Sequence, residues 1–407
     1  QNIILFMKRR LSMKQLTKIS LCILTAFMSI TTVNAKTPSN PEPVWFFPDF
    51  SEDEKLSDWD LTCDNVGACR AVGFYGEESF DYEDENQREA SLMIKREAGN
   101  PKVIIKANLN FIEDRDYVVE ETIRQMEQKS AEMFVNGKSY GKVALNFENG
   151  SKLNDVQTKA ILDNIKQPLK IEFRLDKMHS NISTYGLKEV LMKMDEIQGF
   201  ANTPYALWQK GNKSAPTTTY SYPVLQDKPI IGTSSVIDRN SNDGKKLIAL
   251  LKNDLKVQAE KSEIDYQDDC MILDDDSEID EYDKERIQTF DAVQLTKDKK
   301  LVSGLCWTAA YNMGYGMWVV DNKFNKVHQN VGLDLSYQEG NQLFLAIKGR
   351  GLGDCWSLDE WTWDGEKFVQ SFSGNTGMCR GFAGGAWLTP STVIDVASVK
   401  DDISRLD

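Results

Sequence analysis

The sequence is poor in the residues from which enzymes most often build metal and acid–base sites. It contains two histidines, His179 and His328, which disfavours a histidine-rich metal centre and any mechanism that uses several histidines. The zinc-protease motif HExxH and the CxxC motif of redox and zinc sites do not occur. The sequence therefore predicts no catalytic residue and no cofactor, and it favours a protein without enzymatic activity.

Long hydrophobic runs are confined to the start of the chain. Lys14 and Lys18 precede the apolar stretch Ile19–Ile30, which is shorter than the roughly 20 residues that a membrane-spanning helix needs. A basic region, an apolar region and a small residue before Lys36 are typical of a secretory signal peptide, here over residues 1–35. We expect an exported protein, periplasmic in a Gram-negative bacterium or alternatively secreted, with no membrane span after cleavage.

Positive charge is also scarce. The chain has 48 basic and 62 acidic residues, a net charge of −14. Nucleic acids and anionic membrane surfaces attract a positive face, so neither is an expected partner. Charge alone suggests one alternative function, the inhibition of a basic host enzyme such as a lysozyme.

Cysteine is also scarce, but the number and positions of the cysteines predict disulfide bonds. The chain has seven cysteines, and six of them follow the predicted signal peptide. An even number of cysteines in an exported chain predicts disulfides, because the compartment is oxidising. Loop-closure entropy favours the pairing with the shortest loops. That pairing is Cys63–Cys69, Cys270–Cys306 and Cys355–Cys379.

Composition changes along the chain, and six of the nine tryptophans lie after residue 288. The fold class predicted is α+β and β-rich, with two antiparallel-β regions and a few packed helices, stapled by disulfides. The predicted domains are a signal peptide (1–35), a Pro-rich lead-in (36–44), an N-terminal β-rich α+β domain (45–207), a linker (208–230), a helix with an acidic connecting segment (231–287) and a C-terminal Trp/Gly-rich β domain (288–407).

Local patterns predict individual elements. Apolar residues at helical spacing predict helices over residues 153–165, 185–197 and 243–255. Asn136-Gly137 predicts the turn of a hairpin, and Asp364-Gly365 predicts a second hairpin with a type I′ turn.

Residues 348–356 (KGRGLGDCW) form the most unusual segment. Its alternating glycines match neither of the phosphate-loop motifs. One interpretation is structural: Arg350 and Asp354 form a buried bidentate ion pair that fixes the loop. The alternative is a ligand-binding loop that uses the same two residues.

Residues 306–312 (CWTAAYN) form a second dense cluster. Trp307 and Tyr311 have rings that can stack on a sugar or peptide, and Asn312 has an amide that can hydrogen-bond it. The alternative is that the two aromatic residues belong to the core around a disulfide.

An acidic stretch offers a weak calcium candidate. Acidic residues occupy positions one, three, five and twelve of a twelve-residue loop, namely Asp274, Asp276, Glu278 and Glu285. Position six is Ile279, where an EF-hand needs glycine. A solvated acidic loop is the favoured interpretation.

Several motifs together resemble one family, the bacterial exported domain-of-unknown-function family 1176. The N-terminal part is also distantly similar to the invasion-associated locus B proteins. The motifs are Asp58–Asn65 (DWDLTCDN), Cys69–Ala71, Leu92–Gly99, Met194–Gly199, Cys306–Asn312, Gly349–Cys355, Trp361–Gly365 and Cys379–Gly381. Trp356 departs from the pattern, which has a smaller residue there. The resemblance implies a periplasmic location and disulfides, and it supplies no catalytic residues.

Two classes of function follow. The favoured one is a non-enzymatic envelope protein that binds a protein partner or a glycan. The alternative is a hydrolase acting on envelope polysaccharide or peptide, which requires two carboxylates roughly 5–9.5 Å apart in an aromatic cleft.

Overall fold

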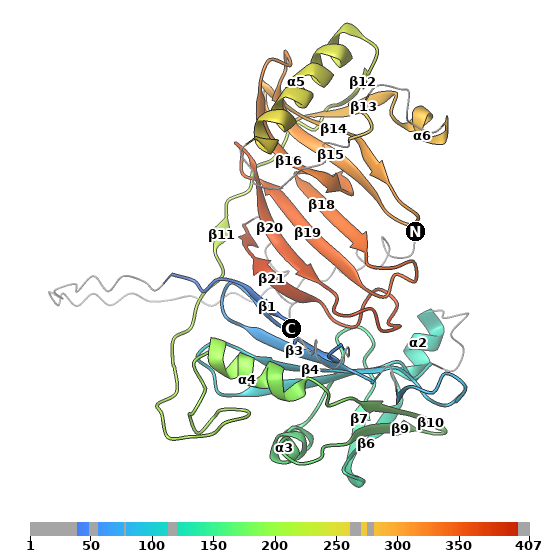
Figure 1. Ribbon diagram of the computed structural model, residues 1–407, viewed down its shortest axis with the longest axis vertical. Helices are drawn as coiled ribbons and strands as arrows, with labels where there is room; N and C mark the ends of the chain where they lie inside the picture. Colours follow the sequence, from blue (N-terminus) through green and yellow to red (C-terminus); the bar gives the residue numbers. More distant parts are fainter. Residues whose placement is uncertain are drawn as a thin grey trace, which may run out of the picture. The chain divides into compact units, whose positions relative to one another are not determined.

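Antiparallel strands, most of them paired with a sequence neighbour, are the main regular structure of the chain in the computed structural model (Figure 1). The structure describes residues 39–48, 56–76, 79–112, 120–260, 270–274 and 281–397. The predicted signal peptide lies outside these ranges. The described residues from Pro41 onward belong to one compact unit. No helix in the described ranges is long and apolar enough to cross a membrane.

The N-terminal sheet has six antiparallel strands in the order β1-β2-β3-β4-β5-β8. Both faces of β2, β3 and β4 are buried. The disulfide Cys63–Cys69 joins directly paired residues of β2 and β3. The strands are β1 (Val44–Phe46), β2 (Trp59–Cys63), β3 (Cys69–Phe74), β4 (Ala90–Arg96), β5 (Val103–Leu109) and β8 (Ser151–Lys152).

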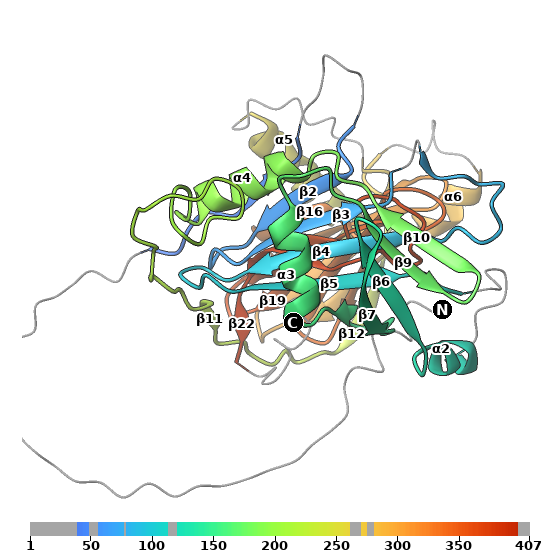
Figure 2. The same ribbon diagram turned by 90° about the horizontal axis from the view of Figure 1, so that it is seen from below.

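A smaller four-stranded sheet and three helices complete the N-terminal half. The strands run in the order β10-β9-β6-β7, and α4 lies across the N-terminal sheet over β2 and β3 (Figure 2). The elements are α2 (Glu120–Met126), β6 (Ser130–Val135), β7 (Lys138–Ala144), α3 (Asp155–Asn164), β9 (Ile171–Leu175), β10 (Met178–Ile182) and α4 (Leu187–Ile197).

The predicted helices and the first hairpin are confirmed here. Helix α3 begins at a capping box in which Asn154 and Gln157 exchange hydrogen bonds. The turn between β6 and β7 has positive φ at Asn136 and Gly137, 50° and 78°, as a two-residue hairpin turn requires.

A fully buried ion pair fastens α4 to the N-terminal sheet. Arg96 of β4 donates to Asp195 at 2.8 Å and to Gln198 at 2.6 Å, and its guanidinium lies 4.3 Å from the ring centroid of Phe200. Asp195 also accepts backbone hydrogen bonds, including one from Leu207 at 2.8 Å. The side chains of Arg96 and Asp195 are 0% and 3% exposed.

The C-terminal half contains two five-stranded antiparallel sheets, β12 to β16 and β17 to β21, each in sequence order. A hydrophobic cluster joins them face to face, with Met317 and Val319 from the first sheet and Leu343 and Trp363 from the second. The strands are β12 (Ser234–Asp238), β13 (Thr289–Gln294), β14 (Lys299–Thr308), β15 (Met313–Asp321), β16 (Val327–Leu335), β17 (Tyr337–Glu339), β18 (Gln342–Lys348), β19 (Trp356–Trp363), β20 (Phe368–Asn375) and β21 (Thr389–Val393).

The third predicted helix, α5 (Asn242–Ala259), covers the other face of the first C-terminal sheet through Leu247, Leu251 and Leu255. The disulfide Cys270–Cys306 lies in the same cluster. A short helix, α6 (Glu281–Arg286), precedes β13, and a two-stranded parallel pair joins β11 (Val224–Leu225) to β22 (Asp395–Val396). The β-rich α+β fold class and its disulfides are therefore confirmed.

The predicted hairpin at Asp364-Gly365 is present, but the prediction that its turn is of type I′ was wrong. Strands β19 and β20 are separated by four residues, and positive φ occurs at Gly365. The Asp364 carboxylate accepts hydrogen bonds from the backbone N–H groups of Glu366 and Lys367, at 2.7 and 2.8 Å. These side-chain bonds close a longer loop, whereas a type I′ turn would need two central residues at positive φ.

Candidate functional site

Two loops, which we call the paired loops, lie against each other at the ends of neighbouring hairpins. The first comprises residues 309–312 between β14 and β15, and the second comprises residues 349–355 between β18 and β19. The Tyr311 ring is so close to Gly351 that a Cβ added to this glycine would lie 3.5 Å from it. The structure thus brings together the two segments singled out in the sequence.

Arg350 and Asp354 form the expected bidentate ion pair. Nε and Nη2 of Arg350 donate to the two carboxylate oxygens of Asp354, at 2.8 and 2.5 Å. The backbone N–H of Gly381 adds a third hydrogen bond to this carboxylate, at 2.6 Å. Burial raises the pKa of Asp354, but the hydrogen bonds from Arg350 and Gly381 outweigh it and hold the pKa below its usual value.

The prediction that this pair is buried is correct for Asp354 and wrong for Arg350. The Asp354 side chain is 2% exposed, whereas the Arg350 side chain is 43% exposed. The reason is local: Asp354 precedes the disulfide Cys355–Cys379 and points at the backbone of Gly381, while Arg350 lies in the outer part of the loop. Part of the Arg350 side chain is therefore accessible to solvent.

Asn312 holds the two paired loops together. Its side-chain amide donates to the carbonyl of Lys348 at 2.9 Å, and its side-chain oxygen accepts from the N–H of Lys348 at 3.0 Å. The side chain thus continues the hydrogen-bonding pattern of a strand between the loops. We expect Asn312 to position the loops. Because both polar atoms of its side chain bond Lys348, this geometry does not support the predicted role of Asn312 as a direct ligand contact.

The base of the second loop is fixed by aromatic and disulfide contacts. The ammonium of Lys348 lies 5.3 Å from the ring centroid of Trp356, and Trp356 Nε1 donates to the Gly353 carbonyl at 2.8 Å. The third predicted disulfide, Cys355–Cys379, ties this base to the segment that follows β20. All three disulfides of the shortest-loop pairing are thus present.

Apolar side chains in and next to the paired loops are exposed to solvent. Leu352 is 76% exposed, Tyr311 46% and Met313, at the start of β15, 40%. Trp307 is half-buried and packs at the edge of the core around Cys270–Cys306, so it fits the core interpretation better than the ligand interpretation. The exposed group is therefore Tyr311, Leu352 and Met313 beside Arg350.

Metal ligation has little support among these residues. Asp354, Cys355 and Cys379 place one potential ligand atom each within 4.8 Å of one another, but the two sulfurs are bonded to each other and a disulfide is not a thiolate ligand. Of the calcium candidates, Asp276 and Glu278 lie outside the described residues. Glu285 is an exposed residue of α6.

One pentapeptide, Gly137–Gly141, has the GxSxG spacing of a nucleophile elbow, but its structure is different. An elbow places serine in a sharp turn between a strand and a helix, whereas Ser139 lies within β7, in a hairpin. Its hydroxyl donates to Glu132 at 2.5 Å. His179, in β10, pairs with Asp84 at 3.0 Å and its side chain is 44% exposed.

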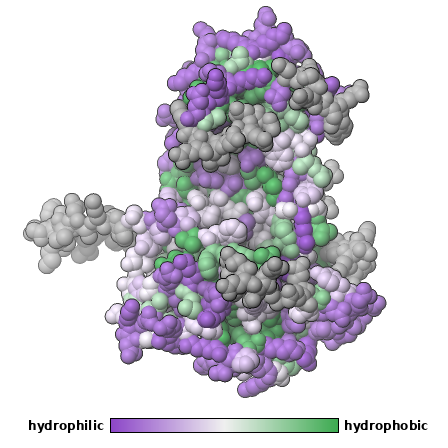
Figure 3. All heavy atoms as spheres, viewed as in Figure 1, coloured by the Kyte–Doolittle hydropathy of each residue, from purple (hydrophilic) through white to green (hydrophobic). Residues whose placement is uncertain are grey.

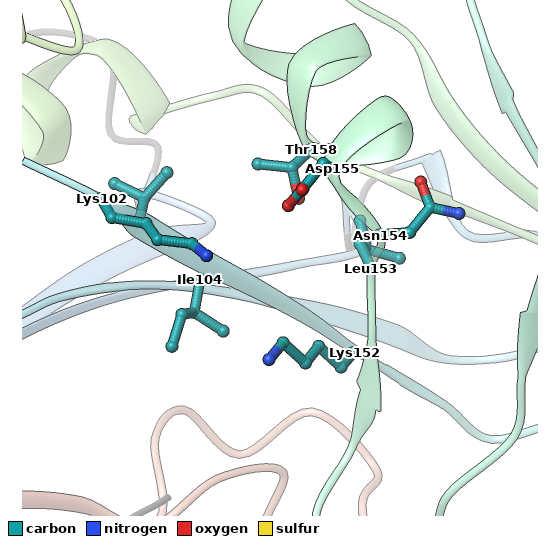
Figure 4. Close-up of a pocket in the computed structure, with 8 residues that line it drawn as sticks. Lys102, Ile104, Lys152, Leu153, Asn154, Asp155 and Thr158 are labelled. Atoms are coloured by element: carbon teal, nitrogen blue, oxygen red, sulfur yellow. The ribbon is translucent and has the colours of Figure 1, made fainter.

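A pocket of about 340 Å³ with a mixed polar and apolar lining lies between the N-terminal sheet and α3. Lys102 and Lys152 reach into it from the sheet, and Asp155 and Thr158 come from the first turn of the helix (Figure 4). Asp155 is the one carboxyl residue in its described lining. This pocket therefore lacks the carboxylate pair that a glycosidase requires.

Comparison with protein-family models places the chain in a defined class. The model described as a protein of unknown function, DUF1176, matches residues 53–393. The chain belongs to this family, as the sequence motifs indicated. No curated protein and no solved structure matches it. The matched range contains the paired loops and all strands of the N-terminal sheet except β1.

Proposed function

We propose that this protein is a non-enzymatic binding or accessory protein of the bacterial cell envelope, exported to the periplasm. The signal-peptide pattern of residues 1–35 and the three disulfides support export, since disulfides persist in oxidising compartments. The N-terminal likeness to the invasion-associated locus B proteins is consistent with the same location.

The paired loops are the proposed contact surface. The observation that carries this proposal is the exposure of Tyr311, Leu352 and Arg350 on loops that are otherwise tightly fixed. Tyrosine and arginine dominate the energetics of binding surfaces. A fixed loop loses little conformational entropy on binding, so contacts made there translate efficiently into affinity.

The ligand class that this surface fits best is an envelope glycan. The Tyr311 ring offers a flat apolar face and a hydroxyl, and the exposed part of the Arg350 guanidinium offers donors for hydroxyl or carboxylate groups. The hydropathy of the face seen in Figure 3 is mixed over β19 and β20, while hydrophilic residues gather over α5 and around α3. A protein partner is the competing ligand class.

The test is co-sedimentation of the purified protein with peptidoglycan sacculi. We expect wild type to sediment and Tyr311→Ala to lose at least tenfold in affinity with an unchanged melting temperature. Tyr205→Ala is the matched control, because Tyr205 is 53% exposed and lies outside the paired loops. Equal binding by wild type and Tyr311→Ala would show that the paired loops are not the contact surface. Release of soluble fragments from the sacculi would contradict the non-enzymatic assignment.

A further inference from the structure

Strand β2 carries a column of polar side chains on the face opposite its core residues. Successive residues of a strand point to opposite faces. Trp59, Leu61 and Cys63 belong to the N-terminal hydrophobic core. The polar column consists of the alternate residues Asp58, Asp60, Thr62 and Asp64, and each of these is less than a tenth exposed.

The outer carboxylates of the column are neutralised by buried arginines. Asp58 accepts from Arg380 at 3.0 Å, and Asp64 accepts from Arg70 of β3 at 3.0 Å. All four side chains are at most 7% exposed. Asp64 also accepts from the hydroxyl of Tyr222 at 3.0 Å. Each outer aspartate therefore has a fixed positive charge beside it.

Asp60, between them, has no such partner. Its Oδ1 is buried without a hydrogen bond from any described residue, and the same is true of Thr62 Oγ1 and Arg70 Nη2. Burial raises the pKa of the Asp60 carboxyl to about 7. A buried carboxyl without a compensating charge favours its neutral form, because ionisation would leave a charge in a medium of low polarity.

The segment between β20 and β21, residues 376–388, covers this face; we call it the strap. Asp60 lies directly opposite Val72 in the β2–β3 pairing, and Val72 packs against Phe382 and Trp387 of the strap. Trp387 Nε1 donates to Ser91 Oγ at 2.8 Å. The strap and the following strand β21, which contacts β2, together close the polar column from water.

Three consecutive strap residues connect the column to the paired loops. Cys379 is bonded to Cys355, Arg380 pairs with Asp58, and the N–H of Gly381 donates to Asp354. A second backbone bond runs from Gly384 N–H to the Gly353 carbonyl at 2.9 Å. A change in how the strap sits on β2 would therefore alter the support of the Arg350–Asp354 loop.

We propose that Asp60 is a pH-sensitive latch beneath the strap: the neutral carboxyl lets the strap stay packed on β2, and ionisation favours a state in which the strap has lifted and water reaches the carboxylate. This proposal is independent of the glycan-binding function and its test uses no ligand. The other charged groups on the surrounding elements each have a partner. They are Asp58 with Arg380, Asp64 with Arg70, Lys95 of β4 with Glu97 at 3.1 Å, and Glu89, which accepts from Asn110 at 3.1 Å and lies beside Gly381 of the strap.

The sign of the pH dependence follows from linkage. The closed state holds the Asp60 proton up to a pKa of about 7, while a solvated aspartate releases it near about 3.9. Between these values the open state binds fewer protons than the closed state, so the opening constant rises about tenfold per pH unit. Below this window and above it, Asp60 contributes no pH dependence. Closure is therefore strongest in acid and weakest at neutral and alkaline pH.

Hydrogen exchange of the strap tests the latch. Exchange of residues 376–388 is followed by mass spectrometry at pH 5 and pH 7, and each rate is divided by the intrinsic rate at that pH. We expect the opening constant of wild type to be about fiftyfold higher at pH 7 than at pH 5. In Asp60→Asn, which cannot ionise, the two constants should agree within about threefold. Asp176→Asn, an exposed aspartate in the hairpin of the small sheet, should behave like wild type.

A direct titration keeps the proposal testable if Asp60→Asn fails to fold. The carboxyl carbon of Asp60 in the wild-type protein is followed by NMR between pH 3 and pH 9. A midpoint more than two pH units above that of Asp176 supports the latch. A midpoint near that of Asp176, or equal strap exchange in wild type at pH 5 and pH 7, overturns it.

Discussion

Two arginine–aspartate pairs, one in each half of the molecule, both have a buried aspartate but differ in the exposure of the arginine. Arg96–Asp195 joins β4 to α4 with side chains that are 0% and 3% exposed. Arg350–Asp354 closes one of the paired loops, and its arginine is 43% exposed. In both pairs the aspartate is also held by backbone N–H groups. The difference lies in the arginine alone.

This difference separates a structural role from a binding role. Loss of one partner of a buried pair leaves an uncompensated charge in the interior, so Arg96 is expected to matter for folding. The Arg350 side chain is 43% exposed, so solvent screens part of its charge and its loss should cost less than that of Arg96. The exposed part of the Arg350 side chain is available to a ligand. Arginine–aspartate pairs in one chain can thus serve different purposes.

The largest expected effect is that of Arg96→Ala. Removal of the guanidinium leaves Asp195 buried, and this should lower the free energy of unfolding by about 3–5 kcal/mol. Arg124→Ala is the matched control, since the Arg124 side chain is 71% exposed in α2 and pairs with Glu121 on the surface. It should change stability by less than about 0.5 kcal/mol. Urea denaturation measures the free energy of unfolding of both variants. Equal losses in Arg96→Ala and Arg124→Ala would contradict the distinction between buried and exposed ion pairs.

The second effect concerns the disulfide at the base of the loop. Cys355 and Cys379 are separated by 24 residues, so replacing both by serine should lower stability by about 3 kcal/mol through the freedom gained by the unfolded chain. Thermal melting of the double variant measures this. A loss below about 1 kcal/mol would mean that hydrogen bonds alone hold the paired loops.

The third effect depends on pH. Because hydrogen bonds hold the pKa of Asp354 below its usual value, the stability that this group contributes is present above the ordinary aspartate pKa. It is lost as pH falls through the lowered value. Asp354→Asn should therefore cost about 2 kcal/mol at pH 6 and less at pH 3. A difference between wild type and variant that grows toward acid would contradict this.

Local sequence patterns predicted the local features of the fold. The apolar spacing in α4 and α5, the Asn136-Gly137 turn and the short-loop disulfides all depend on residues close together in the chain. The type I′ turn predicted at Asp364-Gly365 was wrong, because the Asp364 carboxylate competes for the backbone N–H groups of the turn. Such competition is visible only once the backbone path is known.

The candidate site was less predictable because its support is long-range. Asn312 clamps Lys348, 36 residues away, and Arg380 neutralises Asp58, 322 residues away. The alternation of residues 58–64 indicates two faces, but not which element covers each. The support of Asp354 likewise depends on Gly381 of the strap, 27 residues away, which the residues around Asp354 do not specify.

The most direct test of the account is a paired measurement on Arg350→Ala. We expect a loss of stability of about 1–2 kcal/mol, well below that of Arg96→Ala, because the Arg350 side chain is 43% exposed and the buried Asp354 keeps the hydrogen bond from Gly381. We also expect at least a tenfold loss of affinity for peptidoglycan sacculi. Melting and co-sedimentation are measured on the same preparation. A loss of several kcal/mol with unchanged affinity would contradict the account, because Arg350 would then serve the fold in the same way as Arg96.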